Sequence, residues 1–394
     1  MKQHIFLSSP HMSEEGYEQR YMKEAFDTNW IGLLGKNVTE FEKEIAAKTG
    51  AKQAVALSAG TAAIHMALKA AGVTQGDLVF CQSLTFSATA NPIVYEKAVP
   101  VFIDSDRETW NMDPVALERA FEKYEKIGKK PKAVIVVHLY GICAHIKEIA
   151  ETCRKHQVPL IEDAAESLGT TYLGQHTGTF GDYGIISFNG NKIITSSGGG
   201  MLLVNTEDAE EKAAKVYRWA TQAREPVLWY QHTEIGYNYR MSNILAGIGR
   251  GQLKVLDKRV EKRRYIFEYY RRHLSDLPGI QFMPALKESR SNCWLTAIQL
   301  EANGRVQPLD LIKALEADDV ESRPVWKPMH LQPIFAECDF ISTIEELHVT
   351  ESEMGADNSI SGQLFAHGVC MPSDSNMTDE DLDRVCNVVR KLWE

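Results

Sequence analysis

One lysine of the sequence, Lys192, stands among residues with small side chains. It lies in FNGNKIITSSGGG (residues 188–200), directly after a predicted strand, YGIISF (183–188). Burial at a strand end removes water from a lysine and favours the neutral amine, which is a nucleophile for Schiff-base formation. An ordinary surface lysine is the competing interpretation, because the chain has many lysines. The position of Lys192 and its small neighbours favour the reactive lysine.

Three carboxylates follow another predicted strand. The segment LIEDAAESLG (160–169) places Glu162, Asp163 and Glu166 at its carboxyl end, where ligands bind in open α/β sheets. A carboxylate there could bind a metal, act as a base or pair with a protonated ring nitrogen. The metal interpretation is weak because no His or Cys lies nearby at ligand spacing. For Asp163 alone, a helix cap is a serious competitor.

A third segment could bind a phosphate group. In LSAGTAAIHMAL (57–68) the chain passes from a strand through Gly60 and Thr61 into an amphipathic helix. The first-turn amides and the Thr61 hydroxyl would meet a phosphate at the positive end of the helix dipole. A plain strand-to-helix turn with an N-cap is an equally good interpretation of this segment alone.

Together the three segments supply a phosphate site, a carboxylate and an amine nucleophile, each at a strand end. Pyridoxal phosphate requires this combination: an anchor for the phosphate, an anion against the pyridinium nitrogen and a lysine for the aldehyde. The sequence has neither a GxGxxG turn after a strand nor GxxxxGK[ST]. Chemistry based on NAD or on nucleoside triphosphates is therefore disfavoured.

Short apolar runs supply the elements that must position these segments. Their near-continuous apolarity predicts strands buried on both faces, and helix-length segments such as 61–72 and 113–126 separate most of them. This alternation predicts an α/β fold with a mostly parallel sheet and right-handed crossovers. The predicted strands are QAVAL (53–57), LVFCQS (78–83), VPVFID (99–104), KAVIVVHLYG (132–141), VPLIEDAA (158–165), YGIISF (183–188) and GGMLLV (199–204).

The sequence pattern changes near Met241. Apolar residues from Met241 to Val260 recur at helical spacing, and we expect a single helix that continues to about residue 274. Beyond Leu277 the pattern predicts a smaller α+β domain. The predicted domains are a large α/β domain, 1–250, and a small C-terminal domain, 251–394. Because no linker or repeat separates them, we expect an extensive interface between the two.

The composition is that of an ordinary globular protein. The 394 residues carry 53 acidic and 43 basic side chains, and the net charge of -10 argues against a nucleic-acid or anionic membrane surface. Seven scattered cysteines without a CxxC pair indicate reduced thiols and no metal site. The N-terminal apolar patch is too short for a signal peptide, and no run approaches a membrane span, so we expect a cytoplasmic protein.

The ordered motifs of the chain resemble those of the DegT-type nucleotide-sugar aminotransferases, which are pyridoxal phosphate enzymes of fold type I. The resemblance covers nearly the whole chain and implies a mostly parallel seven-stranded sheet in a large domain, followed by a smaller α+β domain. Besides the segments above, it rests on GYEQRYMKEAFDTNWIGLLGKNVTEFE (16–42), SLTFSATANPIVYEKAVPVFIDSD (83–106), GYNYRMSNILAGIG (236–249), SRPVWKPMH (322–330) and VCMPS (369–373).

The resemblance also implies roles for individual residues. Lys192 would form the covalent imine with pyridoxal phosphate, and Asp163 would pair with the pyridine nitrogen. The phosphate would be bound by Gly60, Thr61 and Ser187. Glu166 would lie beside the phenolic oxygen of the cofactor.

Further implied positions concern the ring face, the second subunit and the substrate. Phe86 would stack on the cofactor ring, although an aromatic residue after a strand is more often part of the core. Asn238 would reach the phosphate from the other subunit, which makes a homodimer with shared active sites the smallest functional unit. Arg240, His330 and Trp326 match positions near the substrate.

Two positions depart from the family pattern. Glu166 stands where the family usually has Gln or His, and Gly198 stands where it has glutamate. A carboxylate beside the phenolic oxygen would repel it unless it is protonated or bonded through water. With NGNKIIT and SRSNCW, these departures resemble the branch that makes UDP-4-amino-4,6-dideoxy-N-acetylglucosamine, the precursor of bacillosamine-type sugars in bacterial protein glycosylation.

The reaction implied by this branch is the transfer of the amino group of L-glutamate to the 4-keto carbon of a UDP-linked 4-keto-6-deoxy-N-acetylhexosamine. An aminotransferase for a 3-keto or pentose sugar is the stronger alternative. A sugar dehydratase is weaker, because family members that dehydrate carry histidine at the position of Lys192. A regulatory protein that binds the cofactor without turnover is disfavoured by the complete set of Lys192, Asp163 and Thr61.

Overall fold

The central sheet of the protein has eight strands. The computed structural model describes residues 3–302, 304–350 and 354–394. All strands of this sheet share one direction except β9, which runs antiparallel to both of its neighbours. In spatial order the strands are β1 (Gln53–Leu57), β9 (Gly200–Val204), β8 (Tyr183–Ser187), β5 (Leu160–Asp163), β4 (Pro131–Val137), β2 (Leu78–Gln82), β3 (Val99–Ile103) and β14 (Phe340–Ile341).

Seven of the eight strands correspond to the predicted ones, and the predicted count of seven is wrong by one. The additional strand, β14, comes from the C-terminal part of the chain and pairs in parallel with the edge of β3. It is only two residues long, Phe340 and Ile341, and two residues carry no periodic pattern. The mostly parallel α/β fold is confirmed.

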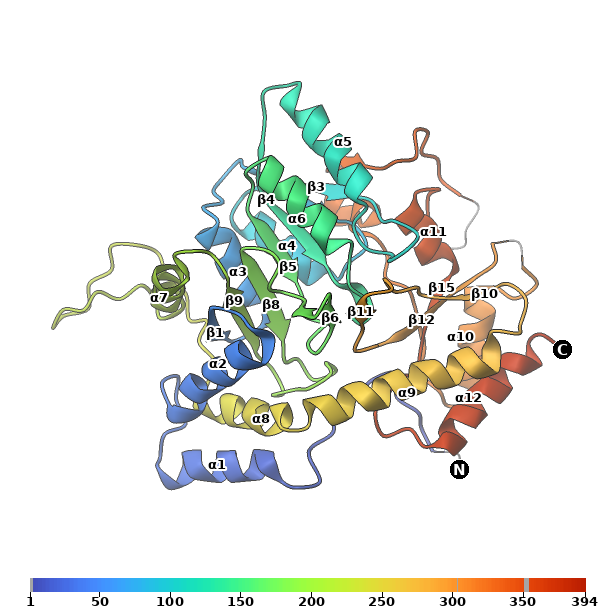
Figure 1. Ribbon diagram of the computed structural model, residues 1–394, viewed down its shortest axis with the longest axis horizontal. Helices are drawn as coiled ribbons and strands as arrows, with labels where there is room; N and C mark the ends of the chain where they lie inside the picture. The colour runs from blue at the N-terminus through green and yellow to red at the C-terminus, as the bar shows by residue number, and fades with distance from the viewer. Residues whose placement is uncertain (1–2, 303, 351–353) are drawn as a thin grey trace.

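Helices cover both faces of the sheet, as Figure 1 shows. Alternate residues of each strand point to opposite faces, so the sheet takes part in separate apolar clusters on its two sides. On one face lie α3 (Gly60–Ala70), α4 (Ser87–Tyr95) and α7 (Ala209–Ala220). On the other lie α2 (Lys36–Thr49), α5 (Pro114–Glu125), α6 (Ile146–Lys155) and α8 (Asn243–Leu253), with α1 (Tyr17–Asp27) packed on α8.

The prediction of a single helix from about 241 to 274 is wrong. The structure has α8 and then α9 (Leu256–Leu274), because Val255 leaves helical geometry at φ -110° and ψ 6°. Glycines hold α8 tightly in the large domain: a Cβ on Gly249 would lie 2.6 Å from the Phe41 ring. The break lets α9 turn away from this packing and run along the smaller domain (Figure 1).

The smaller domain is built on a four-stranded antiparallel sheet. Its strand order is β10 (Ile280–Phe282), β12 (Thr296–Leu300), β15 (Gly368–Met371) and β13 (Arg323–Pro324). The helices of this part are α9, α10 (Pro308–Ala317), α11 (Ile360–His367) and α12 (Asp379–Lys391). The apolar core of this part joins the sheet to α9, α10 and α12.

The two parts of the chain are connected at several places. A three-stranded sheet joins β11 (Ser289–Arg290) to β6 (Thr171–Tyr172) and β7 (Gln175–His176). Near the N-terminus, Ile5 forms a bridge with Val320 of the C-terminal part. The predicted boundary at residue 250 falls inside α8 and stays a prediction. Within the described ranges, no helix has both the length and the apolarity to cross a bilayer.

Candidate active site

Lys192 lies in the loop that connects β8 to β9, where the sequence placed it. Its Nζ is 3.5 Å from Oε1 of Glu166 and 4.2 Å from the centre of the Trp294 ring. The side chain is 13% exposed, so the amine is largely shielded but still accessible. A carboxylate and the face of an aromatic ring thus flank the amine.

Glu166 is buried beside this amine. Its Oε2 accepts a hydrogen bond of 2.7 Å from the backbone N–H of Tyr140. Burial raises the pKa of the Glu166 carboxyl to about 7, against the opposing effects of Lys192 and of the Tyr140 amide. At neutral pH this carboxyl can therefore be protonated or ionised, and the repulsion anticipated at this position is avoided in its protonated form.

Asp163 ends β5 with its carboxylate buried. Its Oδ2 accepts a 2.7 Å hydrogen bond from the Thr89 hydroxyl, and its Oδ1 accepts one of 3.1 Å from the Ala165 N–H. Burial raises the pKa of Asp163, while Lys192 and His138 act in the opposite direction. A buried carboxylate with two donors has acceptor capacity left, and a cationic group beside it would stabilise its charge.

Glu162, the neighbouring carboxylate, lies on the other face of the strand and has a structural role. It is fully buried, and Oε2 is 2.9 Å from Nε2 of His138. The backbone N–H groups of Gly178, Phe180 and Gly181 donate to its two oxygens. These four partners fix the loop before β8, which leaves Asp163 and Glu166 as the carboxylates that face Lys192.

The proposed phosphate site is formed where α3 begins. No side chain among the described residues caps this helix, so its first-turn amides are open to an anion. A Cβ on Gly60 would lie 3.3 Å from Cβ and 3.5 Å from Oγ of Ser187, at the end of β8. Gly60 and Ser187 are therefore adjacent, with Thr61 on the first turn of the same helix.

Aromatic rings form a wall at this edge of the sheet. The Phe86 ring is 57% exposed and lies 5.5 Å from the ring of Trp326. Trp326 contacts Tyr140 at 5.0 Å, edge to face, and its backbone N–H donates to the Tyr140 hydroxyl at 3.1 Å. An exposed ring supported from one side can serve as a platform for a planar ligand, so the core interpretation of Phe86 is disfavoured.

Three predicted site residues lie outside this group in the subunit. Asn238 is exposed and pairs with Thr221 in an isolated bridge. Arg240 is buried, where its Nη1 donates to Oε1 of Glu42 at 2.7 Å and to the Ala56 carbonyl at 2.9 Å. Their predicted roles toward phosphate and substrate stay predictions.

His330 also contacts residues of its own subunit. Its Nδ1 lies 2.7 Å from Oγ of Ser83, and its Nε2 lies 3.0 Å from Oδ2 of Asp357. The ring stacks on Phe340 at 3.6 Å. These contacts join the end of β2 to the C-terminal part of the chain, and a role of His330 at the substrate stays a prediction.

The residues present fit pyridoxal phosphate. The helix start at Gly60 offers amides to a phosphate, and Asp163 offers a buried carboxylate to a protonated ring nitrogen. Lys192 offers an amine, and Phe86 an exposed ring face. No group of three or more potential metal ligands occurs among the described residues.

Four residues of the site were not predicted from the sequence. Thr89 and Tyr140 donate to the two site carboxylates, and Trp294 lies under the lysine. The side chain of Asn292 donates to the carbonyl of Glu166 at 2.8 Å. Thr89 lies in SLTFSATANPIVYEKAVPVFIDSD, and Asn292 and Trp294 lie in SRSNCW, but neither segment indicated what these residues contact.

Comparisons with known proteins agree with this site. The model of the DegT/DnrJ/EryC1/StrS aminotransferase family matches residues 12–390. EpsN of Bacillus subtilis, which carries the name of a pyridoxal phosphate-dependent aminotransferase, is 53% identical over 393 residues, covering 100% of this chain and 97% of its own length. A GDP-perosamine synthase of Caulobacter vibrioides is 36% identical over 382 residues, covering 97% of this chain and 96% of its own.

Solved structures share the fold as well. A family aminotransferase from Brucella abortus superimposes with a TM-score of 0.85 at 26% identity, and the match covers 96% of each chain. These matches confirm the resemblance, the fold type I architecture and the cofactor that were expected from the sequence. The chain belongs to the DegT/DnrJ/EryC1/StrS aminotransferase family and is a pyridoxal phosphate-dependent sugar aminotransferase.

Proposed function

We propose that this enzyme transfers the amino group of L-glutamate to the 4-keto carbon of a UDP-linked 4-keto-6-deoxy-N-acetylhexosamine. The product would be UDP-4-amino-4,6-dideoxy-N-acetylglucosamine, made in the cytoplasm for bacterial protein glycosylation. The observation that carries the proposal is the contact of Lys192 with Glu166, 3.5 Å apart. Glu166 is the departure from the family pattern that, with Gly198, resembles the branch making this sugar.

Lys192 would move the proton in both halves of the reaction. Pyridoxal phosphate, when bound, supplies an aldehyde for amine exchange and a protonated ring that takes up the electron pair left on carbon. With L-glutamate bound in place of the Lys192 amine, Nζ would take the proton from the α carbon of glutamate and hold it for the next transfer. Asp163 would keep a proton on the ring nitrogen, and the Thr89 hydroxyl and Ala165 N–H hold its carboxylate in place.

The active site would be completed by a second copy of the chain. Residues 222–236 form an arm that projects beyond α7 (Figure 1). The arm is ordered by its own contacts: the N–H of Glu225 donates to the Gln231 carbonyl at 2.9 Å, and Arg224 pairs with His232. Asn238 lies two residues after the arm, exposed as a residue that reaches another subunit would be.

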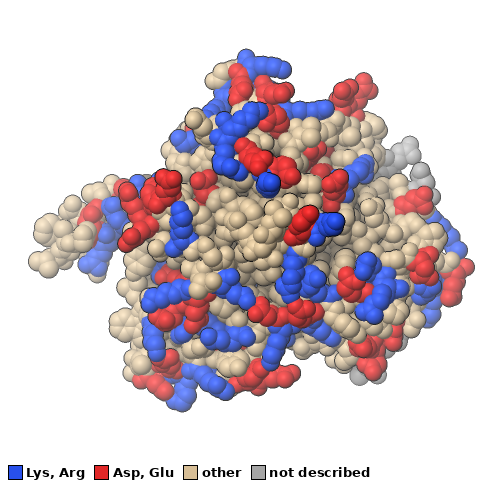
Figure 2. Space-filling model, viewed as in Figure 1, with Lys and Arg blue, Asp and Glu red and all other residues tan. Residues whose placement is uncertain are grey.

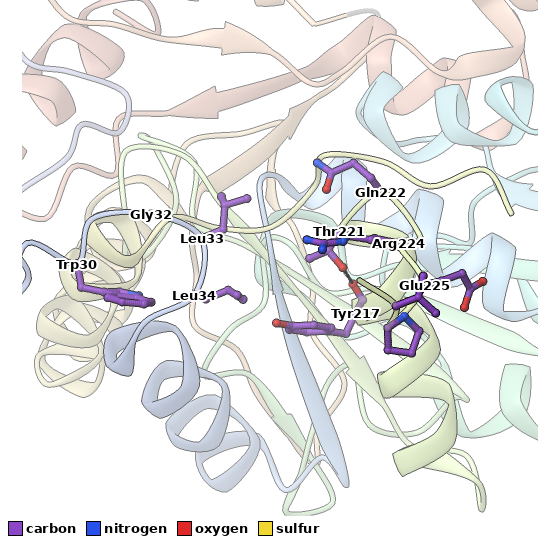
Figure 3. A pocket seen from close by; sticks show the side chains of 11 residues that line it. Trp30, Gly32, Leu33, Leu34, Tyr217, Thr221, Gln222, Arg224 and Glu225 are labelled. Carbon is purple, nitrogen blue, oxygen red and sulfur yellow. Dashed lines mark hydrogen bonds between the residues drawn. The ribbon is translucent and has the colours of Figure 1, made fainter. Parts of the chain in front are cut away.

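The apolar surface of the arm supports this homodimer. Leu228, Trp229 and Tyr230 at its tip are 98%, 63% and 79% exposed, and Figure 2 shows no charged side chain at the outer end of the arm. A cavity of about 650 Å³ lies between the base of the arm and residues 30–34, with Trp30, Leu33 and Leu34 in its wall (Figure 3). Exposed apolar area of this kind marks a protein interface.

Substrate binding would use the side of the site that carries Trp326, and roles of Arg240 and His330 toward the substrate are part of this proposal. Trp326 is half-buried next to Phe86 and so lies where a sugar above the cofactor ring would be. The seven cysteines are all free, which suits a protein of the reducing cytoplasm. A GDP-linked ketosugar is the second candidate acceptor, because a relative named GDP-perosamine synthase is 36% identical to this chain.

The substrate assignment can be tested with purified enzyme, pyridoxal phosphate and L-glutamate. A panel of UDP-, GDP- and dTDP-linked ketosugars is added, and mass spectrometry follows 2-oxoglutarate and the aminated sugar. We expect turnover of the UDP-linked 4-keto sugar and none by Lys192→Ala. Turnover of GDP-sugars alone would favour the second candidate, and turnover of dTDP-sugars alone would exclude both.

The role of Lys192 has its own test. Reduction of the loaded enzyme with borohydride should fix the cofactor on the peptide that contains Lys192. Recovery of the reduced cofactor on another lysine, or its covalent retention by Lys192→Ala, would contradict the proposed chemistry. This test needs no sugar substrate, so it is independent of the sugar panel.

A further inference from the structure

Trp294 contacts the loop of Lys192 in two ways. The face of its ring lies under the amine, with Nζ of Lys192 4.2 Å from the ring centre. Its indole N–H donates to the backbone carbonyl of Asn191, the preceding residue, at 2.8 Å. One side chain thus holds both the backbone before the lysine and the charged end of the lysine itself.

The position of Trp294 is fixed from several sides. The side chain is 2% exposed, and its backbone N–H donates to Oδ1 of Asn292 at 2.9 Å. Arg263, itself buried, donates from Nη1 to the Trp294 carbonyl at 3.1 Å. The amide of Asn292 also donates to the carbonyl of Glu166. Trp294 and Glu166, the two groups that flank the Lys192 amine, are therefore joined through one asparagine.

An ammonium group gains from both of these neighbours. The negative face of an indole ring attracts a cation, and the attraction grows when water is excluded. The carboxylate of Glu166 lies within 3.5 Å of the same Nζ. A neutral amine gains little from either group, so both neighbours act on the lysine only when its amine carries a positive charge.

We propose that Trp294 is a positioning residue that receives the Lys192 amine when it has been released from the cofactor and has accepted a proton. The inference rests on the proposed function of Lys192. In the proton transfer, the bond between the α carbon of glutamate and its hydrogen breaks and an Nζ–H bond forms. The electron pair stays on the carbon side, and the positive charge that appears on Nζ faces the indole ring and Glu166.

This role predicts that one variant slows one reaction and spares another. Trp294→Leu should slow the half-reaction with L-glutamate about tenfold, because the ammonium product of the proton transfer is no longer stabilised. The isotope effect with glutamate deuterated at the α carbon should rise. Capture of pyridoxal phosphate by the cofactor-free protein needs the neutral amine, so its rate should not fall. Binding of pyridoxamine phosphate, which forms no bond with lysine, should stay within about twofold.

Two further variants keep the test independent of folding. Tetrafluorotryptophan placed at position 294 keeps the shape and the N–H but weakens the negative ring face, and it should reproduce the slower proton transfer. Trp393→Phe is the matched control, because the Trp393 indole N–H also donates to a carbonyl, that of Pro278 at 2.9 Å, far from the site. It should leave both reactions unchanged.

Several outcomes would overturn the role of Trp294. An unchanged isotope effect in both variants at position 294, or equal slowing of cofactor capture and of the half-reaction, would indicate a structural role only. If borohydride fixes the cofactor on another lysine, the proposed function itself fails. If it fixes the cofactor on Lys192 and the isotope effects do not change, only the inference about Trp294 fails.

Discussion

Nζ of Lys192 lies 3.5 Å from Oε1 of Glu166, and the carboxyl group is buried while the amine is nearly so. Both groups come from loops that follow strands of the central sheet, β8 for the lysine and β5 for the glutamate. The pKa of Glu166 is raised to about 7 by burial, although Lys192 opposes the shift. The carboxyl can therefore exchange its proton near neutral pH.

Glu166→Gln should alter how the stability of the cofactor-free protein depends on pH. The carboxyl ionises at about 7 when folded and at the ordinary 4.5 when unfolded, so the folded state binds more protons between these values. The contribution of Glu166 to the free energy of unfolding of the wild-type protein therefore falls by roughly 2 to 3 kcal/mol as pH rises from 5 to 8. Glu166→Gln has no such loss. The free energy of unfolding of the variant minus that of wild type should therefore increase as pH rises from 5 to 8.

Urea unfolding at several pH values measures this difference. Glutamine can still accept the hydrogen bond from Tyr140, which limits other effects of the substitution. Glu118→Gln is a control that should differ from wild type by a constant amount over this range, because Lys155 lowers the pKa of Glu118 and the effect of that shift on stability changes only below the ordinary pKa of 4.5. A pH-independent difference between Glu166→Gln and wild type would contradict the raised pKa.

Thr89→Val should weaken cofactor binding through Asp163. The Thr89 hydroxyl donates to Oδ2 of Asp163 at 2.7 Å, and a hydrogen bond to an ionised group contributes about 1.5–3 kcal/mol. We expect at least a tenfold loss in affinity for pyridoxamine phosphate, measured by calorimetry, with the fold intact. Thr85→Val, which removes a hydroxyl 2.8 Å from that of Thr89, should have a smaller effect. Equal effects of the two variants would argue against the route through Asp163.

The sequence predicted the main sheet and the chemistry at its edge because both leave local patterns. Buried strands are continuous apolar runs, and β5 and β8 end at Asp163 and Ser187, within the predicted segments. The break at Val255 and the strand β14 leave no such pattern, since both depend on packing between distant parts of the chain. Trp294 was missed for the same reason: 102 positions separate it from Lys192, and only the fold brings them together.

Mixed dimers test whether the active site is shared between subunits. Lys192→Ala and Asn238→Ala should each be nearly inactive alone. In a mixed dimer of the proposed kind, one site carries both changes and the other carries neither, so co-expression should restore up to about a quarter of wild-type activity. The two variants carry different tags, and the activity of the purified mixtures measures this restoration directly. No restoration in confirmed mixed dimers would place Lys192 and Asn238 in the same subunit's site.

Leu228→Asp should separate the subunits. Leu228 is 98% exposed in the single chain, so the change has no contact to break within the subunit. If the tip of the arm is covered by a second copy, a buried charge would strongly disfavour association. Sedimentation velocity should then show a monomer. The thermal melting profile at low protein concentration should be unchanged. Ile127→Asp, which alters an apolar side chain 61% exposed on another loop, should leave the dimer intact.

Arg240→Met distinguishes a structural arginine from one that binds substrate. The guanidinium is almost fully buried, donates to Glu42 and to the Ala56 carbonyl, and lies 4.5 Å from the centre of the Tyr217 ring. Its removal leaves the Glu42 carboxylate with less compensation, and we expect a loss of about 2 kcal/mol in the free energy of unfolding. Arg240→Met combined with Glu42→Met should recover part of that loss, because the unpaired carboxylate is then absent. A large rise in KM for the ketosugar at unchanged stability would instead support the substrate role implied by the resemblance.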